Sequence, residues 1–435
     1  MIIFEKNFLH NGKGGCNYEK VLYGPCGYCF DGFSFVAPVY AKVTFGSTQM
    51  TPVAEREFLL NQISSFSKSS GISVELLNFE YPDLLSRLEA EHKTGKITIN
   101  LVADLQANLY MMAAEGLFED LKNVTIPGRT FIKTFEQYSY QGGQKVFIPW
   151  IQATYVMAIN KKAFDYLPAG LKKEDVMNGT GKWTYDALLA WSKNLMEKTK
   201  MPQLGFPLGP KSLWHRFLHG CIYPSYTGTQ ASKFNSGEAL VMWAYLKDLF
   251  KYVHPACTTW DNMDQPLLRN EVMIAWDHTA RVKQAVVERP NDFVIAPVPR
   301  GPKGRGYLVV LTGLAIPKGA SMDESVKLID FLTSPKTQVA ILENVGFFPV
   351  IQEASEAMPE GALKILTQGV VAQSSAADSI VCIAPGLGQY GGEFNEIYRT
   401  AFNRIVFSNE SASKVVTELS QRLSKLYKQA GIPID

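Results

Sequence analysis

Three tryptophans lie outside regular apolar patterns, at Trp150, Trp214 and Trp276. Asp277 directly follows the last of them and places a carboxylate beside an aromatic ring. Carbohydrate sites use this pairing, because a sugar ring has an apolar C–H face that stacks on an aromatic ring and a fringe of hydroxyls that bind carboxylates and amides. Each indole could instead belong to the hydrophobic core, as most tryptophans do. The pattern predicts a carbohydrate ligand, with core packing as the alternative for each tryptophan.

The sequence contains no motif of a common catalytic or phosphate-binding site. Gly-x-Ser-x-Gly, His-Glu-x-x-His and the P-loop pattern are all absent. His215 and His219 have helical spacing, but no nearby carboxylate completes a metal site, so we expect no metal and no cofactor. We therefore predict a protein without catalytic activity. The alternative is a carbohydrate-active enzyme or a sensor module, because the paired carboxylates of a glycosidase cannot be identified from one sequence.

Length and composition favour two domains of ordinary size without a membrane-spanning segment. The chain has 435 residues, of which 46% are hydrophobic and 19% are charged, and a chain of this length usually folds around more than one hydrophobic core. No apolar run approaches the roughly 18 to 20 residues that span a membrane. The 43 basic and 41 acidic side chains leave a formal charge of only +2, so we expect no nucleic-acid partner. We also expect a monomer.

The first part of the chain, residues 1–41, differs in composition from the rest and ends in a candidate export signal. Val39 and Ala41 stand at the minus three and minus one positions that signal peptidase accepts. Cys26 and Cys29 form a Cys-x-x-Cys pair, but no second pair completes a zinc site. We predict an atypical signal peptide. The alternatives are a lipid-anchored leader, a disordered leader and a misplaced start codon.

Strands and helices alternate regularly from residue 42 onward. Such an alternation indicates parallel strands joined by crossover helices, so the predicted fold class is α/β. The expected strands are 43–47, 72–77 and 97–103, and the expected helices begin at Thr51 and near Leu84.

Two loops with hydrogen-bonding side chains follow expected strands. Gln49 comes after the first strand and Asp104 after the third. Ligands of an open α/β sheet bind beyond the carboxyl ends of its strands, so we expect both side chains near a ligand. The alternatives are ordinary turn chemistry for Gln49 and an N-cap of the helix 107–115 for Asp104.

Short segments from residue 42 to the C-terminus occur in the order found in one family. By this order the chain resembles the extracellular solute-binding proteins of group one, which include the maltose-binding proteins. It departs from the family pattern at Trp276 and Asp277, where many relatives have Gly-x-Trp slightly later, and at Ile159 and Asn160, where relatives have Tyr-Asn. The matching segments include NLVAD (100–104), AAEGLFEDL (113–121), IPW (148–150), MAINKKAF (157–164), WTYDAL (183–188), NEVMI (270–274), APVP (296–299), GLAIPK (313–318), FLTSP (331–335) and GFFPV (346–350).

The resemblance implies a two-lobed periplasmic-binding-protein fold, the type II clamp. In this fold each lobe is a mostly parallel sheet flanked by helices, hinge strands join the lobes, and solute binds in the cleft between them. The implied N-terminal lobe comprises residues 42–153 and 280–344, and the C-terminal lobe comprises residues 154–279 and 345–435. The implied crossings lie near residues 150–154, 278–299 and 344–349.

The resemblance also implies a function and a location. The chain would be the substrate-binding protein of an ABC importer, which binds a mono- or oligosaccharide and delivers it to permease subunits in the membrane. It would act in the periplasm or outside the cell, held at the surface through the transporter. A polyol, a glycerol phosphodiester or a polyamine is the alternative solute. Together, the predicted ligand-binding residues are Gln49, Asp104, Trp150, Tyr155, Trp214, Trp276, Asp277, Gly313 and Phe347.

Overall fold

The computed structural model describes residues 41–358, 361–383, 387–431 and 434. The predicted signal peptide, apart from Ala41, and the pair Cys26 and Cys29 lie outside the described residues. Within the described part of the chain, no helix combines the length and the apolar character needed to cross a membrane.

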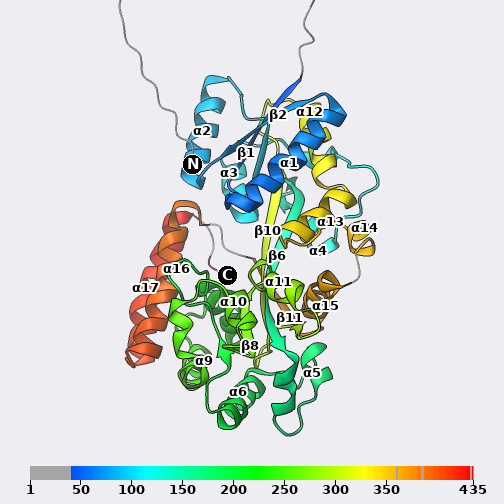
Figure 1. The fold of residues 1–435 in the computed structure, drawn as a ribbon. Coiled ribbons are helices and arrows are strands. Elements are labelled where there is room, and N and C mark those ends of the chain that lie inside the picture. The colour runs from blue at the N-terminus through cyan, green and yellow to red at the C-terminus, as the bar shows by residue number, and fades with distance from the viewer. Residues whose placement is uncertain (1–40, 359–360, 384–386, 432–433, 435) are drawn as a thin grey trace, which may run out of the picture. The chain divides into compact units, whose positions relative to one another are not determined.

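The predicted alternation of strands and helices is confirmed at the start of the described chain. Strands β1 (Lys42–Ser47), β2 (Ser73–Asn78) and β3 (Leu101–Leu105) are parallel, and β1 lies between the other two. Helices α1 (Val53–Ser70) and α2 (Tyr81–Thr94) connect them (Figure 1). Because the three strands run in the same direction, their carboxyl ends meet at one edge of the sheet.

Helix α1 packs on these strands through one apolar face. Its buried side chains are Leu59, Ile63 and Phe66, and they share a hydrophobic core with Phe45 of β1. Their spacing of four and three residues puts them on the same side of the helix. The helix ends at Gly71, where φ is 72°, a left-handed conformation that glycine adopts without steric cost.

Two long buried strands, β6 (Ile148–Asn160) and β10 (Arg305–Ala315), run through the middle of the sheet in opposite directions (Figure 1). The end of β10 pairs with β3, and its beginning pairs with β11 (Ser379–Ile383). The second half of β6 pairs with β8 (Ile274–His278) and β9 (Phe293–Ala296). Each long strand therefore joins two groups of strands, as hinge strands of a two-lobed α/β fold do.

The pairing of β9 bears on where the chain passes between the lobes. Strand β9 pairs with the second half of β6, and helix α11 (Thr279–Glu288) also packs against β6. We therefore propose that the second crossing lies inside β10 instead of near residues 278–299, and that 280–299 belong with the C-terminal lobe. Gln152 and Phe348, which form an isolated bridge, mark the other two proposed crossings.

The other elements surround these strands. Helix α15 (Ala362–Ser374) covers β9, and α17 (Ala412–Ala430) packs along α16 (Gly391–Phe402). The remaining strands are β4 (Tyr140–Gln141), β5 (Gln144–Lys145) and β7 (Leu204–Gly205), and the remaining α-helices are α3 (Gln106–Ala114), α4 (Lys133–Gln137), α5 (Lys173–Met177), α6 (Tyr185–Thr199), α7 (His215–Phe217), α8 (Tyr223–Thr227), α9 (Gly237–Leu249), α10 (Asp264–Leu268), α12 (Met322–Leu332), α13 (Pro335–Asn344) and α14 (Gln352–Glu356).

Candidate functional site

The loops that follow β1 and β3 lie side by side. The Thr48 amide donates to the Ala103 carbonyl at 3.1 Å, and the Thr48 hydroxyl donates to Oδ1 of Asp104 at 2.6 Å. Nε2 of Gln49 donates to the Thr48 hydroxyl at 2.9 Å, and Oε1 of Gln49 accepts a bond from Thr312 of β10 at 3.5 Å. Gln49 and Asp104 therefore belong to one hydrogen-bonded group at the carboxyl ends of the strands.

Asp104 is fully buried, and only one of its carboxylate oxygens has partners among the described residues. Oδ1 accepts bonds from the Leu105 amide at 2.6 Å and from the Asn108 side chain at 3.0 Å, in addition to Thr48. Burial raises the pKa of Asp104 to about 6, although these bonds favour the carboxylate. The N-cap of α3 is Leu105 and not Asp104. Oδ2 of Asp104 is thus a buried acceptor that a solute or a water could satisfy.

A cleft of about 480 Å³ opens between the N-terminus of α1 and the segments around α7 and α11. Its remaining wall comes from β10 and from the segment after α13. This volume suits a small-molecule ligand. Two predicted site residues, Gln49 and Phe347, line it. Its polar lining residues are Gln49, Glu55, Arg216, His278, Arg281 and Asn344.

Charged side chains reach the cleft from α1, α7 and α11. Burial raises the pKa of Glu55 to about 7, and the positive charge of Arg281 opposes this rise. Nη1 of Arg216 donates to Oη of Tyr155 at 3.2 Å. Nη1 of Arg281 donates to the carbonyl of Asp261 at 3.1 Å. Each guanidinium is therefore oriented by one hydrogen bond and keeps further N–H donors for a solute.

His278 contributes a neutral hydrogen-bond donor to the same cleft. Burial, together with the positive charges of Arg216 and Arg281, lowers the pKa of His278 to about 3. Nδ1 accepts a bond from the Ala280 amide at 3.2 Å and so caps α11. The neutral imidazole therefore carries its proton on Nε2 and can donate to a hydroxyl or an oxyanion.

Trp276 does not present an open face in this structure, because other rings surround it. The indole is fully buried. Tyr155 stacks on it with centroids 4.6 Å apart and planes 10° apart, Phe206 lies 6.0 Å away at 28°, and Phe217 meets it edge-on at 5.2 Å. Tyr155 in turn contacts two cleft residues, through its bond from Arg216 and its edge-on contact with His278 at 5.1 Å. Trp276 therefore supports the cleft from behind Tyr155, and the predicted stacking role finds no open surface here.

Trp150 and Trp214 also lie in the hydrophobic core and outside the lining of the cleft. Trp150 is fully buried with Phe45 edge-on at 6.1 Å, and its carbonyl accepts a bond from Gln338 at 2.7 Å. Trp214 is 7% exposed and packs edge-on against Phe402 at 4.8 Å. Both tryptophans therefore fit the alternative given in the sequence analysis, which was packing in the hydrophobic core.

Asp277 and Gly313 have structural surroundings as well. The carboxylate of Asp277 is buried and accepts bonds from the His278 amide at 2.7 Å and the Met263 amide at 2.9 Å. Burial raises its pKa to about 7. A Cβ atom at Gly313 would lie 2.1 Å from the ring of Phe147, so only glycine allows the ring to pack on β10. Both residues shape the crossing strands and the entry to α11 without offering a free polar group.

Five polar side chains of the cleft were not among the predicted residues. They are Glu55, Arg216, His278, Arg281 and Asn344. One signal in the sequence could have found two of them. Arg281 stands in the first turn of the helix that starts after strand β8, and Glu55 in the first turn of the helix that starts after β1, which is the position where α/β sheets bind ligands.

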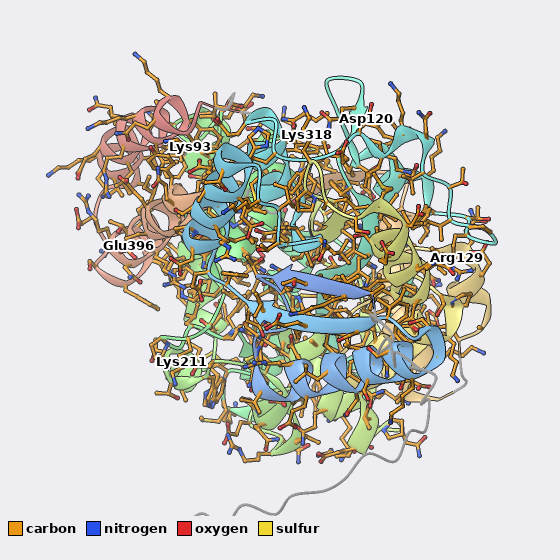
Figure 2. The ribbon with its side chains drawn as sticks, turned by 90° about the horizontal axis from the view of Figure 1, so that it is seen from above. Lys93, Asp120, Arg129, Lys211, Lys318 and Glu396 are labelled. Carbon is orange, nitrogen blue, oxygen red and sulfur yellow. The ribbon has the colours of Figure 1, made fainter. Side chains whose placement is uncertain are left out.

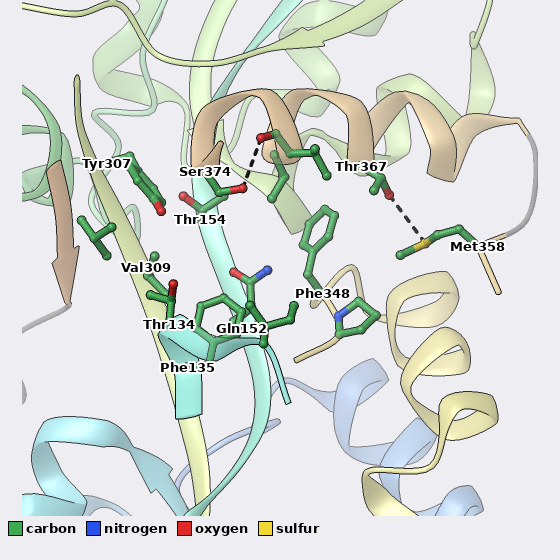
Figure 3. Close-up of a pocket in the computed structure, with 15 residues that line it drawn as sticks. Thr134, Phe135, Gln152, Thr154, Tyr307, Val309, Phe348, Met358, Thr367 and Ser374 are labelled. Atoms are coloured by element: carbon green, nitrogen blue, oxygen red, sulfur yellow. Dashed lines mark hydrogen bonds between the residues drawn. The ribbon is translucent and has the colours of Figure 1, made fainter. Parts of the chain in front are cut away.

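A second cavity of about 160 Å³ lies on the other face of the crossing strands (Figure 3). Its lining includes Gln152 and Thr154 of β6 and Tyr307 and Val309 of β10, whereas the next residue of β10, Val310, lines the cleft. Because successive side chains of a strand point to opposite faces, β6 and β10 separate the two cavities. The second cavity is lined mainly by apolar groups and hydroxyls, without a charged side chain among the described residues.

Comparison with known proteins identifies one family. A model described as bacterial extracellular solute-binding protein matches residues 61–364. A search of curated protein sequences finds no significant match.

Solved structures share the fold at low sequence identity. The sugar-binding protein MalE of Xanthomonas citri is 15% identical with a TM-score of 0.68, and the match covers 89% of this chain and 98% of that chain. Maltose-bound MalE3 of T. maritima is 18% identical with a TM-score of 0.65, covering 89% and 100%. UgpB of Mycobacterium tuberculosis, in complex with glycerophosphocholine, is 17% identical with a TM-score of 0.66, covering 90% and 100%.

Proposed function

The chain belongs to the bacterial extracellular solute-binding protein family, and we propose that it is the receptor of an ABC importer that carries a carbohydrate. It would act in the periplasm or outside the cell, as a monomer, and deliver its solute to permease subunits. Two of the similar structures have ligands in their names, maltose and glycerophosphocholine. The alternative solutes are a glycerol phosphodiester, the class of ligand in the UgpB complex, a polyol and a polyamine.

One observation carries the carbohydrate assignment. The cleft gathers donors and acceptors of different kinds around one partly buried ring. Gln49 and Asn344 supply amides, His278 supplies an N–H, and the half-buried ring of Phe347 lines the same cleft. Sugar hydroxyls both donate and accept, so a mixed lining with an accessible aromatic ring suits them. We propose that Phe347, which was also among the predicted ligand-binding residues, supplies the stacking surface that the sequence analysis sought first in Trp276.

The lining of the cleft also favours a receptor over a glycosidase. Glycoside hydrolysis generally requires two carboxyl groups on opposite sides of the scissile bond. Among the described residues, Glu55 is the one carboxylic acid that lines the cleft. We therefore propose that the solute is bound and released without chemical change.

The proposal is tested by binding and recovery of the solute. The protein is screened against neutral and acidic mono- and oligosaccharides, polyols and polyamines by thermal shift, and each hit is measured by titration calorimetry. Chromatography after prolonged incubation should return the bound saccharide intact. Released products would contradict a receptor function, and binding of polyols or polyamines without any saccharide would contradict the carbohydrate class.

A matched pair of variants locates the binding site. Phe347→Ala should weaken saccharide binding by up to about tenfold, because a stacked aromatic ring contributes about 0.5 to 1.5 kcal/mol. Phe407→Ala is the control, since Phe407 is 51% exposed beside α16 and away from the cleft lining. Equal affinities of the two variants would show that the saccharide binds elsewhere.

A further inference from the structure

The cleft carries an excess of positive charge. Arg216 and Arg281 both line it, and Glu55 is the one acid that does so among the described residues. No ion pair joins either arginine to a described side chain; their hydrogen bonds go to the neutral Oη of Tyr155 and to the carbonyl of Asp261. A guanidinium has five N–H donors. Both arginines therefore reach the cleft without a direct ion pair and with most of their donors unmatched.

Glu55 offsets little of this charge. Burial raises its pKa to about 7, so that a large share of the side chain is protonated and neutral at neutral pH. The buried His278 adds no positive charge of its own, but it offers its Nε2 proton. The cleft therefore has more donors than acceptor charge, because Glu55 is the one acid of its described lining and Asp277, which the charge of Arg281 also influences, lies outside that lining.

Two helices begin at the cleft and add to its positive potential. Pro52, Ala54 and Glu55 belong to the start of α1, and His278, Ala280 and Arg281 belong to the start of α11. Helix N-termini carry free amides and a partial positive charge, which favour anions. The hydroxyl of Thr279, the first residue of α11, is buried and has no partner among the described residues.

The arginines of the cleft differ from the charges on the outside of the molecule. Lys93, Lys211 and Glu396 extend from separate elements into solvent (Figure 2). Arg216 and Arg281 are half-buried, and the acceptor of Arg216 is Tyr155, which the stacked indole of Trp276 holds in place. An arginine fixed in this way is ordered before a ligand arrives, which lowers the entropy cost of binding an oxyanion.

We propose that the solute of this cleft is an acidic saccharide, whose carboxylate or phosphate binds Arg216 and Arg281. This inference rests on the proposed carbohydrate function and adds a charge to the solute. A uronic acid and a sugar phosphate share the required chemistry, a planar or tetrahedral oxyanion that accepts several N–H bonds. The hydroxyls of the sugar would bind Gln49, Asn344 and His278.

The test compares saccharides that differ in charge alone. Titration calorimetry at low ionic strength measures galactose against galacturonic acid, their matched oligomers, and glucose against glucuronic acid and glucose 6-phosphate. We expect at least one acidic saccharide to bind about tenfold or more tightly than its neutral counterpart. Its affinity should fall as salt is added, because salt screens the arginines. A carboxylate preference points to a uronic acid, and a phosphate preference to a sugar phosphate.

Variants assign the effect to the two arginines. Arg216→Gln and Arg281→Gln should each weaken binding of the acidic saccharide by about 10- to 100-fold, because each loses charge-assisted hydrogen bonds. Neutral saccharides should change by about threefold or less. Arg422→Gln is the control, because Arg422 is exposed on α17 and pairs with Glu393. Melting temperatures confirm that each variant is folded.

Each contrary outcome has its own meaning. Neutral saccharides that bind as tightly as acidic ones, with affinities that both glutamine variants leave unchanged, would overturn the inference and leave the carbohydrate receptor standing. Inorganic phosphate that binds as tightly as any acidic saccharide would overturn it by showing a site for the anion alone. Failure of every saccharide, neutral or acidic, to bind the folded protein would overturn both the inference and the proposed function.

Discussion

The two faces of the crossing strands β6 and β10 differ in how their polar groups are satisfied. On the rear face, Gln373 of α15 donates to the Thr154 hydroxyl and to the Tyr155 carbonyl, each at 3.0 Å, and accepts from the Val298 amide at 2.9 Å. On the cleft face, Arg216 and Arg281 each use one donor. The hydrogen bonds of Gln373, here called the rear network, leave none of its partners unsatisfied, whereas the two arginines on the cleft face keep free N–H donors.

This difference shows how the same two strands serve stability and binding. Side chains alternate along a strand, so one face can be packed while the other borders a cleft. Buried polar groups without partners cost free energy, and structures keep them where a ligand can supply the partner. The unmatched arginine donors of the cleft face support the proposal that solute binds on this face.

The largest expected effect comes from Trp276, on the packed side of Tyr155. Trp276→Ala should lower the free energy of unfolding by about 3 to 5 kcal/mol, because it leaves a cavity among Tyr155, Phe206 and Phe217. Urea denaturation measures this loss, with Trp276→Phe as a milder control. Nearly unchanged stability with lost saccharide affinity would place the indole in an open cleft and contradict the comparison.

The pH dependence of stability should follow Asp277. Burial raises its pKa from 3.8 to about 7, so the folded state binds the proton more tightly than the unfolded state does. The protonated Asp277 carboxyl therefore contributes its full stabilisation below about pH 4, and this contribution is lost as the pH rises to about 7. Between pH 4 and pH 7, ionisation of Asp277 should lower the free energy of unfolding by about 2 to 4 kcal/mol. The fall over the same pH range should be smaller in Asp277→Asn.

Urea denaturation between pH 4 and 8 measures this dependence. The control is Asp165→Asn, because Asp165 is exposed beyond the end of β6. Equal slopes for the wild type and Asp277→Asn would show that the Asp277 carboxyl ionises as freely in the folded state as in the unfolded state.

The rear network should affect stability and leave solute affinity unchanged. Gln373→Leu removes both donors and leaves the Val298 amide and the Tyr155 carbonyl without their partner. The expected loss is about 1 to 3 kcal/mol of unfolding free energy, with saccharide affinity of the folded protein within about twofold. Ser374→Ala, on the next residue of α15, is the control. A large loss of affinity without a loss of stability would assign Gln373 to the solute site.

The smallest change tests the support of Arg216. Tyr155→Phe removes the hydroxyl that accepts from Nη1 of Arg216 and keeps the ring stacked on Trp276. Stability should change by less than about 1 kcal/mol. Saccharide affinity should fall about three- to tenfold, because the guanidinium is no longer oriented. Calorimetry and thermal melting of the same sample distinguish the two effects, and unchanged affinity would remove Tyr155 from the support of the cleft.

Local patterns predicted the parts of this fold that depend on neighbours in sequence. The alternation of strands and helices predicted that β1 and β3 are parallel. The sequence also placed Gln49 and Asp104 in loops at the carboxyl ends of these strands, and the structure joins the two loops through the bond between Thr48 and Asp104. The place of each tryptophan could not be predicted in the same way. Trp276 is buried by Phe206 and Phe217, which reach it through tertiary packing that its own segment does not specify.

The same limit applies to the charges and to the second crossing. Arg216 and Arg281 look like ordinary exposed residues of helices until the cleft brings them together. Helix α11 and strand β9 form a regular unit that could pair with either lobe, and the pairing of β9 with β6 is a long-range contact. Periodicity carries no information about such partners.

The central claim is that one solute is held between the two lobes, which are joined by β6 and β10. A ligand that contacts both lobes favours the closed arrangement by its differential affinity. Small-angle X-ray scattering of the protein, with and without a saturating saccharide identified in the binding screen, measures this directly. The account predicts a smaller radius of gyration with saccharide. An unchanged scattering profile, at concentrations where calorimetry shows full occupancy, would contradict it.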